Sequence, residues 1–189
     1  MTRSSQHPVR VLFIGPTSAL WEAIAGEVAA DLARLTRDGV ELVYRCTGDG
    51  PLEVRSDVDA RAAAPFVART AIDAATDGFD ALIVDCTADP GVADARAAVD
   101  IPVIGAGEAL RSAIARARQP LCMLTGDELR SITASALVAR VSGSATVALG
   151  GTGFSHLVDV ILDAYPGIVV LDPLAIALDA AIDACRAQP

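Results

Sequence analysis

Short apolar runs that alternate with stretches of helical periodicity are the feature that most limits what this chain can fold into. Such alternation is typical of parallel strands that are covered on both faces by helices. Strands are expected at residues 9–15, 40–46, 81–86, 102–105, 120–125, 145–149 and 168–172. The sequence therefore predicts an α/β protein built on a parallel sheet.

Two helices carry recognisable end signals. Ser18 is expected to cap the first helix, and Gly39 lies just beyond its expected end. In the last helix Asp172 is expected as the N-cap, with Pro173 at the first helical position. Cys185 falls on the apolar face of that helix, which predicts a core residue rather than a reactive thiol.

Charge and residue usage exclude several classes of function. The formal net charge is −9 and no basic patch is present, so neither nucleic acid nor an anionic membrane is expected as a partner. All fifteen basic residues are arginine. A chain without lysine forms no Schiff base with pyridoxal phosphate and supplies no Walker A lysine. No apolar run is long enough to span a bilayer, and we expect a soluble cytoplasmic protein.

Cysteine and histidine are too scattered for a metal centre. The chain has four cysteines without a CxxC pair, and only two histidines. A zinc site needs several such ligands at characteristic spacings. No metal site is therefore predicted.

The chain also repeats itself. Residues 78–114 and 144–182 both read as strand, short polar loop, helix, strand and helix. In this alignment Cys86 falls opposite Gly151. The second half is shorter upstream of that position, so it is expected to lack about one strand-helix unit.

We therefore expect two similar lobes that differ in size. The first lobe, residues 10–117, carries Cys86, and the second, shortened lobe spans residues 118–187. Residues 1–9 are expected to form a flexible N-terminus.

The glycine-rich stretch at residues 150–153, followed by a helix and a strand ending in Asp172, looks like the dinucleotide fingerprint of short-chain dehydrogenases. Only 17 residues follow Asp172, the third glycine of that pattern is absent, and the catalytic lysine of that family cannot exist here. A nicotinamide site is therefore disfavoured, and no cofactor is expected.

Another stretch fits the whole chain better. The segment "VDCTADPGVADARAAVDIPVIGAGEA" places Cys86 at a strand end, then Asp89-Pro90-Gly91, then Pro-Val-Ile-Gly and Glu-Ala. This segment resembles the aspartate/glutamate/hydantoin racemase superfamily, and within it most closely the hydantoin and allantoin racemase branch. The resemblance covers nearly all of residues 10–186 and is strongest around Cys86. It implies a parallel-sheet fold of two pseudo-symmetric lobes with a pocket between them, no cofactor, and assembly into a homo-oligomer.

The resemblance implies a specific chemistry at Cys86. In this family one cysteine removes the proton from a carbon next to a carbonyl, and a second cysteine on the opposite face returns one. Asp89 is expected to cap a helix with Pro90 at its first position, so that helix amides lie near the Cys86 thiol and lower its pKa. The carboxylates of Asp85 and Asp89 would raise that pKa.

The departure from the family is at the partner, because the second cysteine maps to Gly151. A pair of cysteine bases is therefore not available. Thr152 is a poor base, and His156 is expected on the solvent side of its helix. Cys122 is expected in the core, and Cys46 stays an outside candidate because it ends a strand at the expected pocket edge.

The loops that follow the strands are expected to bind a small-molecule carboxylate, amino-acid-like or hydantoin-like substrate. The residues assigned to this role are Gly15, Pro16, Thr17, Ser18, Thr87, Ala88, Thr125, Gly151, Thr152 and Gly153.

Three functions stay open. The first is a racemase or epimerase in which Cys86 works with water or a residue from another subunit. The second is a decarboxylase, lyase or isomerase that needs only one proton carrier. The third is a non-catalytic, ligand-binding homologue that keeps the pocket without turnover.

Overall fold

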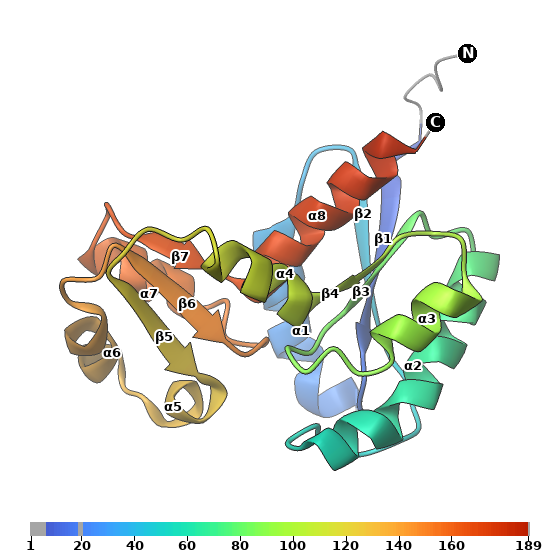
Figure 1. The fold of residues 1–189 in the computed structure, drawn as a ribbon, viewed down its shortest axis with the longest axis horizontal. Coiled ribbons are helices and arrows are strands. Elements are labelled where there is room, and N and C mark those ends of the chain that lie inside the picture. Colours follow the sequence, from blue (N-terminus) through green and yellow to red (C-terminus); the bar gives the residue numbers. More distant parts are fainter. Residues whose placement is uncertain (1–6, 19–20, 189) are drawn as a thin grey trace.

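The computed structural model describes residues 7–18 and 21–188 and contains two parallel sheets (Figure 1). The first sheet has the strand order β2-β1-β3-β4, and the second has the order β5-β6-β7. The strands are β1 (Val9–Gly15), β2 (Val40–Cys46), β3 (Ala81–Val84), β4 (Val103–Gly105), β5 (Leu121–Thr125), β6 (Thr146–Gly150) and β7 (Val169–Leu171). The helices are α1 (Trp21–Leu35), α2 (Asp57–Thr76), α3 (Val92–Ala98), α4 (Ala106–Ile114), α5 (Gly126–Ser131), α6 (Ala134–Val141), α7 (Leu157–Ala164) and α8 (Pro173–Ala187).

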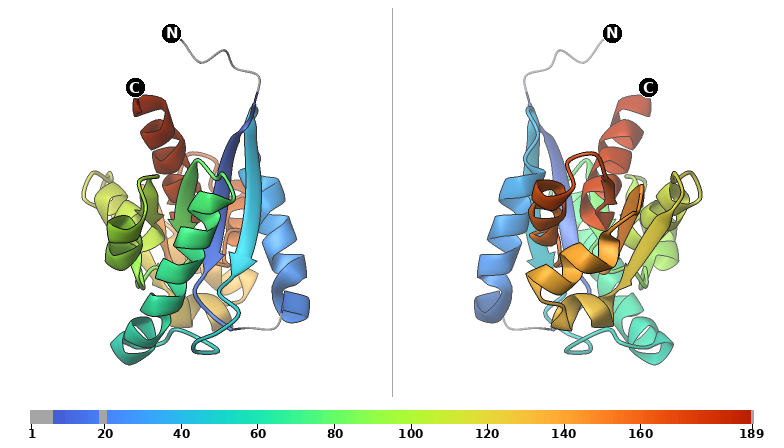
Figure 2. Two further views of the ribbon diagram at one scale, coloured as in Figure 1. Left: turned by 90° about the vertical axis from the view of Figure 1, so that its right-hand side faces the viewer. Right: turned by 90° about the vertical axis from the view of Figure 1, so that its left-hand side faces the viewer.

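The first sheet is buried on both faces, which explains why its strands read as continuous apolar runs. Leu12 and Ile14 of β1 face α2 and α3, whereas Val11 and Phe13 face α1, α4 and α8. Figure 1 shows α2 and α3 on one side of the sheet and α1, α4 and α8 on the other, and Figure 2 shows α1 and α2 on opposite sides of β1 and β2. All four β1 side chains are at most 1% exposed.

The seven expected strands are all present, with ends that differ by at most two residues. β3 ends at Val84, so Asp85 and Cys86 lie in the loop beyond the strand. The expected α/β class and the parallel pairing are confirmed.

The second lobe is a reduced copy of the first. Its strands β6 and β7 pair in parallel as β3 and β4 do, and each pair encloses a helix, α7 and α3 respectively. The lobe has no counterpart of β2. The expected internal repeat and the expected loss of one strand are both confirmed. Helices α5, α6 and α7 pack on the core side of this smaller sheet.

The closing helix α8 does not stay with the second lobe. Leu174, Leu178 and Ile182 belong to the same buried cluster as Phe13 of β1, and α8 also packs along α4. The grouping of residues 118–187 as one lobe therefore differs from the packing, in which the second lobe ends before α8. An apolar stripe predicts that a helix face is buried, but it does not identify the sheet that covers it.

The helix ends agree with the sequence in part. The Asp172 carboxylate accepts a hydrogen bond from the Leu174 amide at 3.0 Å, and Pro173 is the first residue of α8, as predicted. The prediction that Asp89 caps the next helix is wrong, because α3 begins at Val92 after Gly91, which has a left-handed φ of 68°. The expected cap of α1 at Ser18 depends on residues 19 and 20, which lie outside the described residues; the Ser18 hydroxyl donates a hydrogen bond to the Gly50 carbonyl.

Other expectations concern the core and the surface. Cys122 is buried at 5% exposure, and Cys185 packs against the first core, as predicted. Most of the N-terminal segment that was expected to be flexible lies outside the described residues. Among the helices that the structure describes, none has the length and apolar character needed to cross a bilayer.

Candidate active site

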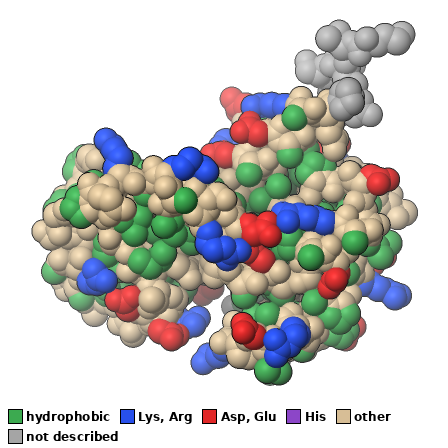
Figure 3. Space-filling model, in the orientation of Figure 1, with side chains coloured by type: hydrophobic (Ala, Val, Ile, Leu, Met, Phe, Trp, Pro, Cys, Tyr) green, Lys and Arg blue, Asp and Glu red, His purple; other side chains and the backbone are tan. Residues whose placement is uncertain are grey.

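A cavity of about 370 Å³ lies between the two lobes, at the ends of β1, β2, β3 and β6. The space-filling view shows a notch between the lobes, on the side where α5 approaches the start of α2 (Figure 3). Ligands of parallel α/β sheets bind beyond the carboxyl ends of the strands, which is where this cavity lies. Its wall is formed by Pro16, Thr17, Ile24, Glu27, Val28, Asp31, Tyr44, Leu52, Glu53, Val54, Arg55, Asp85, Cys86, Arg130, Thr152 and Gly153.

The cavity brings together part of the residue set expected from the sequence. Pro16, Thr17, Cys86, Thr152 and Gly153 line it. The other expected residues are not part of its wall, namely Gly15, Ser18, Thr87, Ala88, Thr125 and Gly151. Several of these have identifiable structural contacts instead.

Gly15 and Thr125 illustrate such structural contacts. A Cβ atom at Gly15 would lie 2.9 Å from Cζ of the Tyr44 ring, so the absence of a side chain lets the ring pass. Thr125 caps α5 through a reciprocal capping box with Glu128.

Cys86 lies in the loop after β3, half-buried, with its side chain at the cavity. Burial raises the pKa of the Cys86 thiol to about 11, and the nearby carboxyl groups of Asp85 and Asp89 act in the same direction. The Ala88 amide opposes this effect through a hydrogen bond to the sulfur. Of the two opposing effects that the sequence predicts, the one that raises this pKa prevails, and the thiol is protonated at neutral pH.

Asp89 braces the loop that carries Cys86. Its Oδ1 accepts a hydrogen bond from the Gly107 amide at 2.8 Å, and its Oδ2 binds the Arg111 guanidinium at 2.6 Å. The Asp89 side chain is only 9% exposed. Instead of capping α3, Asp89 ties the cysteine loop to the first turn of α4, where it meets free amides.

The second lobe reaches the cavity through the loop after β6. The Thr87 hydroxyl donates a hydrogen bond to the Gly150 carbonyl at 3.5 Å, which joins the cysteine loop to this loop. A Cβ atom at Gly151 would lie 3.0 Å from Cε2 of Phe154, so the ring occupies the space beside this glycine. The position that corresponds to Cys86 in the repeat thus carries no acid or base.

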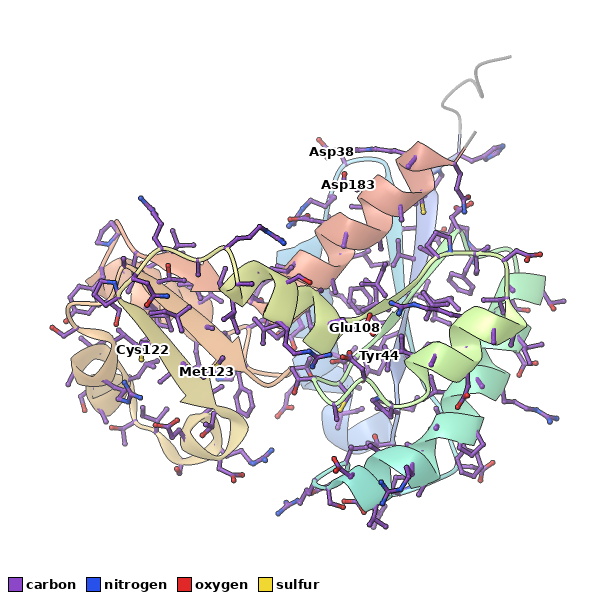
Figure 4. All side chains as sticks on the ribbon, viewed as in Figure 1. Asp38, Tyr44, Glu108, Cys122, Met123 and Asp183 are labelled. Carbon is purple, nitrogen blue, oxygen red and sulfur yellow. The ribbon has the colours of Figure 1, made fainter. Side chains whose placement is uncertain are left out.

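The remaining candidates from the sequence lie away from the cavity wall. His156 is exposed at the start of α7, as predicted. Cys46 ends β2 but does not line the cavity. Cys122 lies on β5 in the smaller lobe, well away from Tyr44 in the larger one (Figure 4).

Sequence reasoning missed an acidic recess at the inner end of the cavity. Asp31 of α1, Tyr44 of β2 and Asp85 all line the cavity. The Asp85 carboxyl group receives hydrogen bonds from Thr152 and Tyr44, while its Oδ1 has no hydrogen-bond partner in the described part of the chain. Asp31 could have been suspected, because it follows Ile24 by seven residues and therefore lies on the apolar face of α1.

Burial shapes the ionisation of this recess. Burial and the nearby carboxyl groups of Asp85 and Asp172 raise the pKa of Asp31 to about 6. Burial also raises the pKa of Asp85, although the hydrogen bonds from Thr152 and Tyr44 oppose that shift. Carboxyl groups whose pKa lies near neutrality are typical of functional clefts.

A comparison with protein families supplies the missing context for this two-lobed fold with a thiol at the interlobe cavity. The family model described as Asp/Glu/hydantoin racemase matches residues 11–133, which is more than half of the chain. The chain belongs to this family. The match includes the first lobe, Cys86 and the first strand of the second lobe. No curated protein matches the sequence of this racemase-family chain.

Solved structures support the fold of this racemase-family member. The allantoin racemase from Klebsiella pneumoniae has a TM-score of 0.76 at 19% identity, over 93% of this chain and 86% of that chain. The allantoin racemase AllR from Pseudomonas fluorescens has a TM-score of 0.71 at 18% identity, over 94% and 91%.

A doubly substituted variant of arylmalonate decarboxylase, in which a glycine is changed to cysteine and a cysteine to serine, has a TM-score of 0.67 at 14% identity, over 96% and 94%. At these identities the likeness concerns the fold.

Proposed function

We propose that this protein is a cofactor-independent racemase or epimerase that moves a proton on and off a carbon next to a carbonyl or carboxylate. The substrate is a hydantoin-like or amino-acid-like small molecule, and Cys86 is the catalytic thiol. The observation that carries the proposal is the position of Cys86 in the wall of the interlobe cavity, beyond the end of β3.

The surroundings of Cys86 support a proton-transfer role. In a racemase or epimerase, water or a residue from another subunit would remove the substrate proton on one face, and the Cys86 thiol would deliver a proton to the other face of the carbanion. In the reverse direction the Cys86 thiolate would be the base. The Ala88 amide hydrogen-bonds the sulfur and would favour the thiolate once it forms. Thr152 and Gly153 line the opposite lobe of the same cavity. Their loop would hold the oxygen on which negative charge develops.

A second candidate is a reaction that needs one proton carrier, such as a decarboxylation, a lyase step or an isomerisation. Two observations favour it. Gly151 carries no functional group where the internal repeat has its counterpart of Cys86, and the pKa of Cys86 near 11 suits a proton donor better than a base at neutral pH. In this candidate the thiol protonates one face of a carbanion that is formed by loss of another group.

Proton exchange in heavy water separates these candidates. The protein is incubated with 5-substituted hydantoins, free amino acids and substituted malonates, and both α-deuteration and optical rotation are followed. Proton exchange with inversion supports the racemase or epimerase. Loss of carbon dioxide with deuterium added to one face of the product carbon supports the reaction that needs a single proton carrier. Absence of both across the panel would indicate the non-catalytic, ligand-binding homologue.

The residue assignment is tested with Cys86→Ala and Cys122→Ala. Cys86→Ala is expected to lower the exchange rate by at least about a hundredfold, because it removes the proton carrier. Cys122→Ala is a matched control, since Cys122 lies in the core of the second lobe. Turnover that survives undiminished in Cys86→Ala would contradict the role of this thiol.

A further inference from the structure

Asp31 is a buried carboxylate that faces the cavity without a partner. It is 9% exposed, it lines the same cavity as Cys86, and no described residue forms a hydrogen bond or an ion pair with its side chain. Arg34, one turn further along α1, forms an ion pair with Asp159 of the second lobe. Arg34, the cationic residue nearest to Asp31 in sequence, is therefore paired with another carboxylate.

Among the described residues, the ionisable groups that act on Asp31 are acids, with the exception of Arg34. Glu27 lies one turn earlier on α1, Tyr44 comes from β2, Asp85 from the end of β3, and Asp172 from the start of α8. The Asp172 carboxylate already accepts a hydrogen bond from the Leu174 amide, and Oδ1 of Asp85 has no hydrogen-bond partner among the described residues. A buried carboxylate without a donor is unfavourable, and a donor on a ligand would remove that cost.

The Asp31 carboxyl group is negatively charged near pH 7.5. Because its pKa is about 6, the group is ionised above neutrality. The inner end of the cavity is therefore negative, and it attracts a cation more strongly than it attracts a neutral group. A second carboxylate on the ligand would be repelled there.

The outer rim of the cavity has a different composition. Arg55 and Arg130 line it, and each also contacts an exposed acid, Glu53 and Asp127 respectively. Both arginine side chains are more than half exposed, and each guanidinium has five N–H donors, so donors stay available to a carboxylate. The cavity thus has an acidic inner end, whereas its rim, which also contains Glu53, carries two exposed arginine side chains.

We propose that Asp31 is the substrate-binding residue that selects a cationic nitrogen, so that the substrate is a carboxylic acid that also carries an ammonium, amidinium or guanidinium group. The nitrogen would donate to Asp31 and to the free oxygen of Asp85, while the carboxylate lies towards the Arg55 and Arg130 rim. This inference rests on the proposed function in one respect only, namely that the interlobe cavity is the substrate site. Among the substrates considered above, it favours free amino acids over neutral hydantoins and dianionic malonates.

Three phenylacetates that differ only in the α-substituent test this selection. Phenylglycine carries an ammonium group, mandelate a hydroxyl and phenylmalonate a second carboxylate. Their dissociation constants are measured by titration calorimetry with the full-length protein near pH 7.5. We expect phenylglycine to bind at least about tenfold more tightly than either of the others, which corresponds to about 1.4 kcal/mol. In Asp31→Asn that preference is expected to disappear.

Two further variants sharpen the result. Asp163→Asn removes an exposed carboxylate on α7, outside the cavity wall, and is expected to change the preference by less than about threefold. Cys86→Ser is expected to keep the preference, because binding does not need the proton carrier. Cationic selection in a protein that shows no proton exchange would thus contradict the proposed function and leave the role of Asp31 intact.

Three results would overturn the proposal. One is a preference for phenylglycine that survives in Asp31→Asn. Another is binding of mandelate or phenylmalonate to the wild type as tightly as phenylglycine. The third is no detectable binding of phenylglycine to the wild type up to about 10 mM.

Discussion

The buried carboxyl group of Asp31 makes the stability of the protein depend on pH in a direction that can be worked out. Its pKa rises from 3.8 to about 6 on folding, because burial and the neighbouring Asp85 and Asp172 disfavour its charge. The folded state therefore binds this proton more tightly than the unfolded state does, so the cost of ionisation is absent below about pH 3.8 and complete above about pH 6. The shift corresponds to about 3 kcal/mol at neutral pH.

Asp31→Asn removes this cost while it keeps the shape of the side chain. The free energy of unfolding of the variant is expected to exceed that of the wild type by up to about 3 kcal/mol above neutrality, with the difference shrinking steadily towards about pH 4. Urea unfolding followed by far-UV circular dichroism at several pH values between these limits measures it. Asp163→Asn, at an exposed position on α7, is the matched control and should change stability by less than about 0.5 kcal/mol at any pH.

The reasoning would be refuted by an Asp31→Asn variant that is no more stable than the wild type at neutral pH. It would also be refuted by a gain that does not depend on pH, because the gain would then not arise from a titrating carboxyl group. The same substitution is expected to abolish the selection of cationic ligands. A variant that is more stable but binds phenylglycine less tightly would show that Asp31 lowers the stability of the fold in return for ligand binding.

Three further predictions concern the cysteine loop and its surroundings. Iodoacetamide should alkylate Cys86 about tenfold more slowly at pH 8 than it alkylates a free thiol. A pKa near 11 leaves about a hundredfold less thiolate, but the thiolate that remains is more nucleophilic, which offsets part of the loss. Peptide mass spectrometry measures the rate, and equal rates would contradict the raised pKa. Gly107→Ala should destabilise the fold by about 1 to 3 kcal/mol in urea unfolding, since its Cβ atom would overlap the Thr87 carbonyl, and an unchanged midpoint would count against that close approach. Gly151→Cys should increase the rate of proton exchange with inversion of the α-carbon. It should also lower the free energy of unfolding by about 1 kcal/mol, because the Phe154 ring has to move by a few tenths of an ångström. Polarimetry with an α-deuterated amino acid would detect the gain, and exchange without inversion would contradict it.

The part of the fold that could be predicted from the sequence depends on local patterns of apolar residues and on the internal repeat. The apolar runs predicted all seven strands because the buried strands of a parallel sheet leave no polar face to interrupt them. The internal repeat predicted the paired architecture of β3-α3-β4 and β6-α7-β7, because equal spacing of strands and helices reproduces equal connections. The shortened second lobe followed from residue counts alone.

Three-dimensional contacts account for what the sequence did not predict. Asp89 looked like a helix cap, yet its carboxylate binds the Gly107 amide, eighteen residues away, and α3 begins later because Gly91 turns the chain in a left-handed conformation. A Cβ atom at Gly91 would lie 2.6 Å from the Ala64 carbonyl oxygen, a close approach that no local pattern records.

The candidate site could be predicted only around its loops. Cys86 and the residues after β1 and β6 stand out as strand-end positions, and five of them line the cavity. Whether these residues bind or react stays a prediction. Asp31 lies in the middle of a helix, and its importance depends on Tyr44, Asp85 and Asp172, which come from other elements. Such a convergence is a property of the tertiary structure and has no signature at one position of the chain.

The return of α8 to the first lobe has a consequence for how the protein is made. The face of the first sheet that contains Val11 and Phe13 is covered in part by residues of α8, which are synthesised after the whole of the second sheet. Until then that apolar face stays incompletely covered, although β1 to β4 have long been synthesised. The first lobe therefore completes its core only after β5, β6 and β7 of the second lobe have been translated.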